Sequence, residues 1–448
     1  MEGKPIMPQA TYHFPNGFLW GTATSSHQVE GNNTNNNWAA WEAQEGRIKF
    51  GHKAGLACDW WGGRWKEDFD RAADTGQNAH RLSIEWSRIQ PKPDSWNEEA
   101  LNYYREMIRG HEQRNMTPMV TLHHFSDPLW LMDLGGWENP DVPALFDKFV
   151  AKVVEALKEY VSLWVTINEP NVYTYGGYLG GGFPPGKNDL KSAFAVLSNM
   201  VQAHALAYRT IHRIQKHARV GIALNYRSFA PARPASPFDR WMAGFLHNNF
   251  NLSFIRAISE GTFRFALQKT TIPEAAKTQD FVGINYYSRD LVAFKPLAFN
   301  SLFHKLSYPK NADLSDTGFI ANIPEGMFEA LKWANRFKLP IIVTENGVED
   351  ADDHLRPRYT IQHIHQMWRA VNFNYPIKGY FHWSLVDNFE WERGWTQRFG
   401  LWGLDPETQV RTRRPSVDVY ADICQRNGIA SEMVEKYAPE VFASLFPA

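Results

Sequence analysis

Hydrophobic positions along the chain follow two alternating periods. The segment 147–160 (DKFVAKVVEALKEY) has its apolar residues spaced three and four apart, as on one face of a helix, and 195–215 and 325–336 behave similarly. The residues on that face of the first segment are Phe149, Val150, Val153, Val154 and Leu157. Between such segments lie short runs rich in β-branched and aromatic residues, which predict strands. These runs cover 18–23, 79–86, 118–124, 164–169, 220–225, 281–287, 341–345 and 379–383.

Strands that alternate with helices indicate a parallel sheet, and eight is the number of strands that closes a (β/α)₈ barrel. We therefore predict a single (β/α)₈ TIM barrel with long βα loops over residues 1–448. A doubly wound open sheet is the alternative, but no G-x-G-x-x-G opens a helix after the first strand, so a dinucleotide-binding fold is less favoured. We find no internal repeat and no Ser- or Pro-rich linker, which favours one domain over two.

Composition narrows the function classes. The 448 residues are 44% hydrophobic and 21% charged, which is ordinary for a globular protein and excludes a disordered or collagenous chain. Lys plus Arg (47) nearly balances Asp plus Glu (48), so we expect no nucleic-acid or membrane partner. Two cysteines exclude a disulfide scaffold. Met1–Phe14 lacks the apolar core of a secretory leader, and no apolar run approaches 18 residues, so we expect a cytoplasmic protein; monomer or oligomer stays open.

Polar and aromatic side chains follow the predicted strands. In a (β/α)₈ barrel the carboxyl ends of all strands meet at one face, where active sites lie. Carboxylates and amides bind hydroxyl groups and indole rings stack on apolar faces, so this set favours a polyhydroxylated small molecule as ligand. The residues at these ends are Gln28, Glu30, Arg81, Glu85, His123, His124, Asn168, Glu169, Asn285, Tyr286, Tyr287, Glu345, Asn346, Trp383, Asp387, Asn388, Glu390 and Trp391.

Two of these carboxylates suit hydrolysis of a glycosidic bond. Glu169 and Glu345 end the fourth and seventh strands, which lie across the barrel mouth from each other. A retaining glycosidase uses one carboxylate to attack the anomeric carbon and a second carboxyl group, roughly 5–5.5 Å away, to protonate the leaving oxygen. The alternative is that each Glu is an ion-pair partner or a helix cap. The presence of both, with Arg81 available, favours the chemical role.

The same residues carry a resemblance to a known family. Residues 166–170 (TINEP) match the T-x-N-E-P motif of glycoside hydrolase family 1, and 343–347 (VTENG) match its [IV]-T-E-N-G motif. Further matches include 14–31 (FPNGFLWGTATSSHQVEG), 81–89 (RLSIEWSRI), 283–287 (GINYY) and 383–391 (WSLVDNFEW). The resemblance covers nearly the whole chain and implies a (β/α)₈ barrel that hydrolyses β-glycosides with retention of configuration.

The resemblance also implies roles for single residues. Glu169 corresponds to the acid/base and Glu345 to the nucleophile, supported by Arg81, Tyr287 and Asn285. We expect Arg81 to lower the pKa of Glu345, and the charge of Glu345 to raise the pKa of Glu169. Asn168 corresponds to the amide that binds the sugar 2-hydroxyl, Trp383 to the stacking platform and Phe399 to the base of the pocket. The remaining sugar-binding residues implied are Gln28, His124, Glu390 and Trp391.

Substrate class follows from the same comparison. Relatives that act on phosphorylated sugars replace the Glu-Trp pair after the eighth strand with residues that bind phosphate. This chain has Glu390 and Trp391 there, so a non-phosphorylated hexose is favoured. The resemblance implies release of terminal non-reducing β-D-glucosyl, and also galactosyl or fucosyl, residues from short oligosaccharides or aryl and alkyl glycosides. Asn171 and Phe125 stand where many members carry Trp, which leaves the aglycone preference open. A transglycosidase using the same covalent intermediate and a non-catalytic sugar-binding protein are the alternatives. We expect no metal and no organic cofactor, since the chemistry needs only two carboxyl groups.

Overall fold

The computed structural model describes residues 10–298 and 301–447. Within them, eight parallel strands close into a barrel, in agreement with the predicted (β/α)₈ fold and against an open doubly wound sheet. The ring closes where the first strand pairs in parallel with both the second and the last strand of the series. The barrel strands, in chain order, are β2 (Leu19–Ala23), β3 (Ala79–Ser83), β4 (Thr117–His123), β5 (Leu163–Asn168), β6 (Arg219–Asn225), β10 (Phe281–Asn285), β13 (Ile341–Asn346) and β14 (Ile377–His382).

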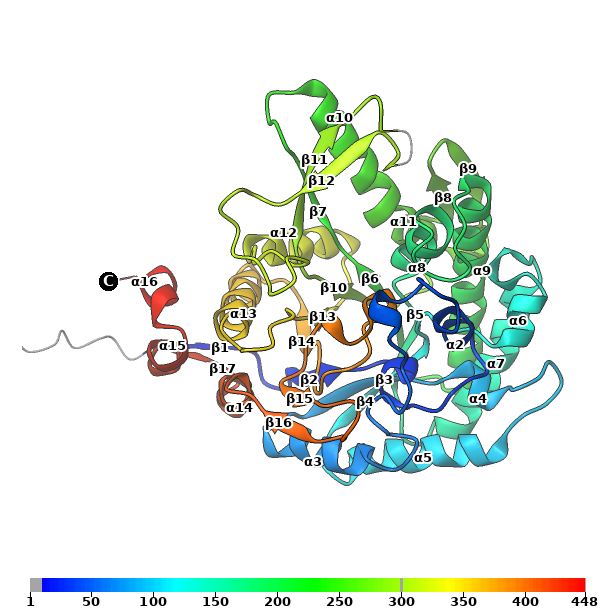
Figure 1. Cartoon of the computed structure of the whole chain (residues 1–448), viewed down its shortest axis with the longest axis horizontal. Helices are drawn as coiled ribbons and strands as arrows, with labels where there is room; N and C mark the ends of the chain where they lie inside the picture. The colour runs from blue at the N-terminus through cyan, green and yellow to red at the C-terminus, as the bar shows by residue number, and fades with distance from the viewer. Residues whose placement is uncertain (1–9, 299–300, 448) are drawn as a thin grey trace, which may run out of the picture.

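Helices surround this barrel (Figure 1). The helix predicted over 147–160 is Val142–Leu157. Every residue of its predicted apolar face is buried, because that face packs on the neighbouring helix and belongs to the core shared with the strands. The other two predicted helices are also present. The outer helices are α3 (Trp65–Asp74), α5 (Glu98–Glu112), α7 (Val142–Leu157), α9 (Leu190–Ile214), α11 (Ser253–Glu260), α12 (Glu325–Ala334), α13 (Arg356–Asn372) and α14 (Ser416–Arg426).

The hydrophobic core has two layers. One layer lies between strands and helices and holds most of the buried aromatic residues. The second fills the barrel itself with side chains such as Met119, Val165, Phe281 and Phe381. Such a filled interior makes the barrel a rigid support rather than a pore, so that only its carboxyl end is open for ligand binding.

Several predicted strands end at other residues in the structure, the second and sixth by two residues or more. The second ends at Ser83, and Trp86 begins the short helix α4 (Trp86–Ile89). The sixth ends at Asn285, so Tyr287 lies beyond it, and the eighth is Ile377–His382 rather than 379–383. The β-rich pattern overruns the strands because aromatic residues continue the pattern after the last ladder hydrogen bond, and residue type alone does not mark that bond.

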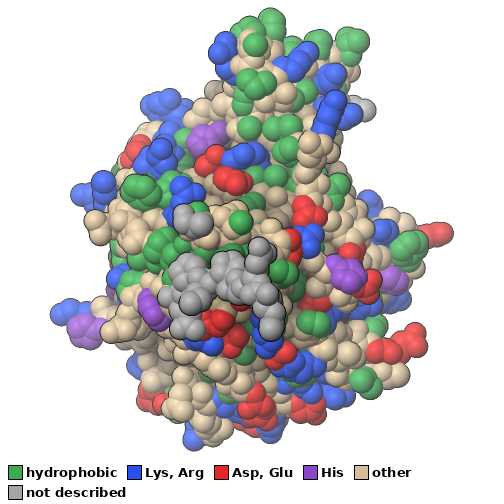
Figure 2. Space-filling view, turned by 90° about the vertical axis from the view of Figure 1, so that its left-hand side faces the viewer, with side chains coloured by type: hydrophobic (Ala, Val, Ile, Leu, Met, Phe, Trp, Pro, Cys, Tyr) green, Lys and Arg blue, Asp and Glu red, His purple; other side chains and the backbone are tan. Residues whose placement is uncertain are grey.

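The βα loops carry additional elements. A three-stranded sheet, in the order β12–β11–β7, packs with α10 (Pro237–Leu246) and projects from the barrel at the top of Figure 1. Figure 2 shows hydrophobic side chains beside Lys and Arg on this projection, and Phe238 and Trp241 on α10 are 62% and 59% exposed.

Further short elements lie in the loops and near the two ends of the described chain. The strands outside the barrel are β1 (Thr11–His13), β7 (Ser228–Pro231), β8 (Thr262–Phe265), β9 (Gln268–Thr271), β11 (Arg289–Phe294), β12 (His304–Ser307), β15 (Trp402–Leu404), β16 (Arg411–Arg413) and β17 (Gly428–Ala430). The short helices are α1 (Ser26–Val29), α2 (Asn37–Glu42), α6 (Leu129–Asp133), α8 (Pro170–Thr174), the π-helical turns η3 (Tyr175–Leu179) and η4 (His247–Asn251), the 3₁₀ turn η8 (Trp391–Thr396), α15 (Ser431–Tyr437) and α16 (Phe442–Leu445).

Two further expectations concern the chain as a whole. Over the described ranges, the structure has no helix with the length and apolarity needed to cross a bilayer. Cys58 and Cys424 are free and buried, as ordinary core thiols are. The prediction about a leader in residues 1–14 falls mostly on residues 1–9, outside the described residues, and the single-domain assignment of 1–448 stays a prediction.

Candidate active site

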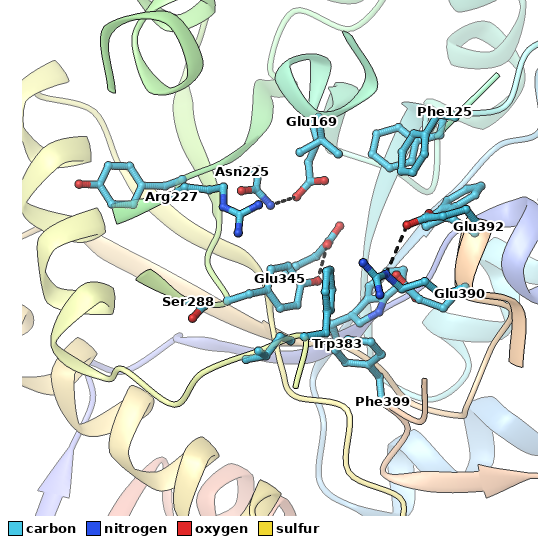
Figure 3. A pocket seen from close by; sticks show the side chains of 18 of the residues that line it. Phe125, Glu169, Asn225, Arg227, Ser288, Glu345, Trp383, Glu390, Glu392 and Phe399 are labelled. Carbon is cyan, nitrogen blue, oxygen red and sulfur yellow. Dashed lines mark hydrogen bonds and ion pairs between the residues drawn. The ribbon is translucent and has the colours of Figure 1, made fainter. Parts of the chain in front are cut away.

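A cavity of about 160 Å³ lies at the carboxyl end of the barrel (Figure 3). Its walls come from loops that follow β4, β5, β6, β10, β13 and β14, so residues far apart in the sequence meet there. The predicted site residues that line it are His124, Glu169, Tyr287, Glu345, Trp383, Glu390, Trp391 and Phe399. The other four, Gln28, Arg81, Asn168 and Asn285, lie behind this wall and hydrogen-bond to residues that form it or to one another.

Glu345 is held by a cation and a phenol. Arg81 Nη1 donates to Glu345 Oε1 at 2.6 Å, and the Tyr287 hydroxyl donates to Oε2 at 2.7 Å. Burial raises the pKa of Glu345 above its ordinary value, while Arg81 and Tyr287 act to lower it. Arg81 thus acts to lower this pKa, as expected, but burial has the larger effect. Removing the carboxylate from water destabilises its charged form more than one ion pair stabilises it.

Glu169 has a different environment. It follows β5 in the left-handed region (φ 44°), which turns its carboxyl group into the cavity opposite that of Glu345 (Figure 3). Its Oε1 accepts hydrogen bonds from the amides of Asn225 (2.8 Å) and Asn285 (2.9 Å). Burial, and secondarily the charge of Glu345, raises the pKa of Glu169 to about 8. Glu169 is therefore mainly protonated at neutral pH, whereas Glu345 has the donors that stabilise an ionised carboxylate.

Asparagine amides connect the two glutamates. Arg81 Nη2 donates to Asn168 Oδ1 at 2.6 Å, and Asn285 Nδ2 donates to the same oxygen at 3.1 Å. Asn285 Oδ1 in turn accepts from the Thr344 hydroxyl at 2.6 Å. Each of these side chains is fully buried, so the network fixes the position of both carboxyl groups before any ligand binds.

The side of the cavity formed by the loop after β14 is also polar. Gln28 Nε2 donates to the Phe389 carbonyl at 2.7 Å and lies 3.2 Å from Glu390 Oε2. Burial and the nearby charge of Glu392 raise the pKa of Glu390 to about 8. Burial lowers the pKa of His124 well below its ordinary value, so this ring is neutral and its Nε2 accepts from Asn168 Nδ2 at 3.0 Å. Hydroxyl-binding donors and acceptors thus converge beside the indoles of Trp383 and Trp391.

Other residues from the strand ends support the site without lining it. His123 Nε2 pairs with Asp127 at 3.0 Å, so the two adjacent histidines face opposite sides, as expected for a strand. Asp387 forms an ion pair with Arg414, and Glu30 forms one with Arg88. Both carboxylates thus contact protein side chains, as expected for residues that support the barrel mouth. Tyr286 points away and donates to the Ile323 carbonyl. In the described ranges, no group of three or more His, Cys, Asp or Glu is arranged to hold a metal ion.

The sequence analysis did not single out several residues of the cavity wall, Asn225 and Arg227 among them. Asn225 ends β6 and donates to Glu169; the rule applied to the other strand ends would have found it. Arg227 lies two residues further on and lines the cavity while its Nε is 2.7 Å from Asp290. No sequence signal marks Arg227, because its position depends on how the loop after β6 folds. Asn171 is also buried away from the cavity, where it donates to the Asn225 and Phe250 carbonyls, and Val172 lines the wall instead.

Comparison with known proteins agrees with this geometry. The model of the family described as "Glycosyl hydrolase family 1" matches residues 10–429. A 1,4-beta-D-glucan glucohydrolase of Thermotoga neapolitana is 34% identical over 93% of this chain and 99% of its own, and a beta-galactosidase of Pyrococcus woesei is 30% identical over 94% and 99%. The solved beta-glycosidase from Pyrococcus horikoshii superposes with a TM-score of 0.89 at 37% identity, covering 96% of this chain and 98% of that one. With its barrel, its motifs and these relatives, the chain belongs to glycosyl hydrolase family 1.

Proposed function

We propose that this protein is a retaining β-glycosidase that releases terminal non-reducing β-D-glucosyl residues. The observation that carries the proposal is the unequal environment of the two facing glutamates. Glu345 contacts Arg81 and Tyr287, whereas the hydrogen bonds that Glu169 receives from the described residues come from neutral amides. A double displacement needs one carboxylate kept ionised and one carboxyl group kept protonated.

In the first step, a Glu345 oxygen attacks the anomeric carbon and the bond from that carbon to the leaving oxygen breaks. Glu169 gives its proton to the leaving oxygen, which departs as the aglycone alcohol. In the second step, the ionised Glu169 takes a proton from water while that water attacks the anomeric carbon and releases Glu345. Two inversions return the β-configuration, and Glu169 is protonated again.

Support for a gluco-configured substrate comes from Glu390 and Gln28 at the far side of the cavity. Their carboxyl and amide groups lie 3.2 Å apart, where hydroxyls at sugar positions 3, 4 and 6 would be bound together. Relatives include proteins named as beta-glucosidases and as beta-galactosidases, and the solved Thermotoga maritima beta-glucosidase is described in complex with deoxynojirimycin (TM-score 0.89, 32% identity, covering 93% of this chain and 100% of that chain). A cleft that accepts glucose and galactose is consistent with both names.

The deciding experiment measures product configuration. Aryl β-D-glucoside, galactoside and fucoside are hydrolysed in an NMR tube, and the anomeric proton of the first product is observed before mutarotation. We expect β-sugar first, with the glucoside preferred; α-sugar first would exclude the retaining mechanism. Added sugar acceptors distinguish a transglycosidase by the fraction of new glycoside formed. A cytoplasmic location stays a prediction that cell fractionation tests.

A further inference from the structure

Arg227 is a positive charge in the cavity wall that the proposed double displacement does not use. It follows the last residue of β6 by two positions and lines the same cavity as Glu169. Figure 3 shows its guanidinium beside Asn225, directed into the cavity. The Arg227 side chain is 36% exposed, whereas its ion-pair partner Asp290 is buried and does not line the cavity. The charged group of Arg227 is therefore accessible to a molecule bound there.

The position of Arg227 is fixed by two neighbours. Asn251 Oδ1 accepts a hydrogen bond from the Arg227 backbone N–H at 3.1 Å, and Asn251 Nδ2 donates one to the Arg227 carbonyl at 2.8 Å. Asp290 Oδ2 lies 2.7 Å from Arg227 Nε. Among the described residues, Asp290 is the one ion-pair partner of this guanidinium, and no hydrogen bond of its terminal nitrogens is found. Because a guanidinium presents five N–H donors in a planar fork, the edge formed by Nη1 and Nη2 is available to a ligand.

The carboxyl groups of the cavity wall leave little unpaired negative charge at neutral pH. They are those of Glu169, Glu345, Glu390 and Glu392. Burial raises the pKa values of Glu169 and Glu390 to about 8, so these two are mainly neutral at pH 7. Glu345 is paired with Arg81, and Glu392 lies 3.3 Å from Arg393, the other arginine of the wall. An anionic group can therefore approach Arg227 without strong repulsion.

Aromatic rings make up much of the same wall. Phe125, Phe183, Tyr308 and Phe319 line the cavity, and the Arg393 guanidinium lies 3.9 Å from the centre of the Phe319 ring. Planar rings pack favourably on such side chains. A carboxylate matches the planar fork of an arginine with two parallel hydrogen bonds. An aromatic carboxylate combines both features.

We propose that Arg227 is a specificity residue that binds the carboxylate of aryl β-glycosides whose leaving group is an aromatic acid. The inference rests on the proposed glycosidase function, since the sugar must occupy the cavity with its glycosidic oxygen at Glu169. The ring of the leaving group then lies among the aromatic side chains. Its carboxylate accepts from Nη1 and Nη2 of Arg227, while Nε keeps its contact with Asp290.

The test compares 3- and 4-carboxyphenyl β-D-glucosides with the neutral 3- and 4-carbamoylphenyl β-D-glucosides, which have nearly the same size and shape. For each pair, the ratio of kcat/KM for the carboxylate to kcat/KM for the amide is measured at pH 7 in the wild type and in Arg227→Gln. Dividing one ratio by the other removes the difference in leaving-group acidity, because both enzymes cleave the same bonds. We expect the ratio to fall about 10- to 100-fold in Arg227→Gln for at least one of the two pairs, as loss of charge-assisted hydrogen bonds implies.

Further variants separate this contact from a general effect of charge. Arg227→Lys keeps the charge without the fork, so its ratio should lie between those of the wild type and Arg227→Gln. Arg240→Gln is the matched control, because Arg240 is exposed on α10 and does not line the cavity. It should keep the wild-type ratio. Arg393→Gln removes the other cation of the wall and should change the ratio less, since the guanidinium of Arg393 already contacts Phe319.

A thermal melt checks that each variant is folded. Because Arg227→Gln leaves Asp290 without its partner, the double variant with Asp290→Asn is also measured, and it should show the same fall in the ratio. If the ratio stays at the wild-type value for both pairs in Arg227→Gln and in the double variant, the inference is overturned, while hydrolysis of the aryl glucosides leaves the glycosidase function intact. A ratio that falls with Arg393→Gln but not with Arg227→Gln overturns the assignment to Arg227. Failure to hydrolyse any β-glycoside, including the neutral amides, overturns the proposed function itself.

Discussion

Arg81 and Glu345 form a buried ion pair of 2.6 Å at the bottom of the cavity, although 264 positions separate them in the chain. The guanidinium of Arg81 is planar, and its second nitrogen reaches Asn168 at 2.6 Å. One side chain therefore positions the carboxylate proposed as nucleophile and the amide proposed to bind the 2-hydroxyl.

Arg81→Lys should keep the positive charge but lose this double contact. A single ammonium group cannot bond Glu345 and Asn168 with the same fixed spacing. We expect kcat/KM for aryl glucosides to fall about 100- to 1,000-fold, comparable to the loss of one transition-state donor, with kcat affected more than KM. Steady-state kinetics on purified variant with an unchanged circular dichroism spectrum measure this. A fall confined to KM would argue against a positioning role for Arg81.

The pH–rate profile should be bell-shaped, with its alkaline limb near pH 8 from deprotonation of Glu169, whose pKa burial raises to about 8. Asn225 donates to Glu169 and so favours its ionised form. Asn225→Ala removes that donor, raises the pKa of Glu169 further and moves the alkaline limb to higher pH. The profile of kcat/KM measures the shift.

Tyr287→Phe is the complementary variant for the acid limb. The Tyr287 hydroxyl stabilises ionised Glu345, so its loss raises the pKa of Glu345 and moves the acid limb to higher pH. Because the two glutamates interact, each limb reports the pair, but the two variants should displace different limbs. If Asn225→Ala displaced the acid limb and Tyr287→Phe displaced the alkaline limb, the acid/base and nucleophile assignments would need to be exchanged.

Truncation of the two glutamates should give different residual activities. Glu345→Gly prevents formation of the glycosyl-enzyme, so hydrolysis should fall by several orders of magnitude, while an α-glycosyl fluoride should fit the vacated space and react with a sugar acceptor. Glu169→Ala keeps the nucleophile, so a dinitrophenyl glucoside, which needs little proton donation, should still form the intermediate.

Azide distinguishes these variants. It needs no base, so it should restore turnover of Glu169→Ala and yield a β-glycosyl azide. Product analysis by NMR identifies the configuration. Rescue of Glu345→Gly with a β-azide, or normal activity in both variants, would contradict the assignment of the pair.

Glu390→Ala should change the choice of sugar. We propose that Glu390 accepts hydrogen bonds from O4 and O6, and a β-D-fucoside lacks the 6-hydroxyl. The variant should therefore lose more activity on the glucoside than on the fucoside, with the ratio of the two kcat/KM values falling about tenfold, as for loss of one hydrogen-bonded substrate group. Trp241→Ala, on the exposed face of α10, is a control that should leave the ratio unchanged.

Chelating agents should leave the activity unchanged. The proposed reaction uses two carboxyl groups and water, so no step calls for a bound ion. Activity with an aryl glucoside is measured before and after dialysis against EDTA, with and without added divalent ions. Loss that a divalent ion reverses would contradict the prediction.

Sequence pattern was sufficient to predict the barrel and the positions that face its open end. Alternation of strand and helix patterns fixes a parallel sheet, and hydrogen-bonded parallel strands bring their carboxyl ends to one face. Glu169, Glu345, Arg81, Asn168 and Asn285 could be placed at that face because each ends or belongs to a strand. The structure brings all five into one hydrogen-bonded network.

The electrostatic effect of these contacts and the shape of the surrounding cavity walls depend on the tertiary structure. The pKa of Glu345 rises rather than falls because burial, which depends on the packing of every loop around the mouth, outweighs Arg81. Arg227, in the loop after β6, and Leu306, on β12, line the same cavity although they are far apart in the sequence. Residue spacing predicts local periodicity and the common end of parallel strands, but loop paths and solvent exclusion arise from long-range contacts that no local pattern encodes.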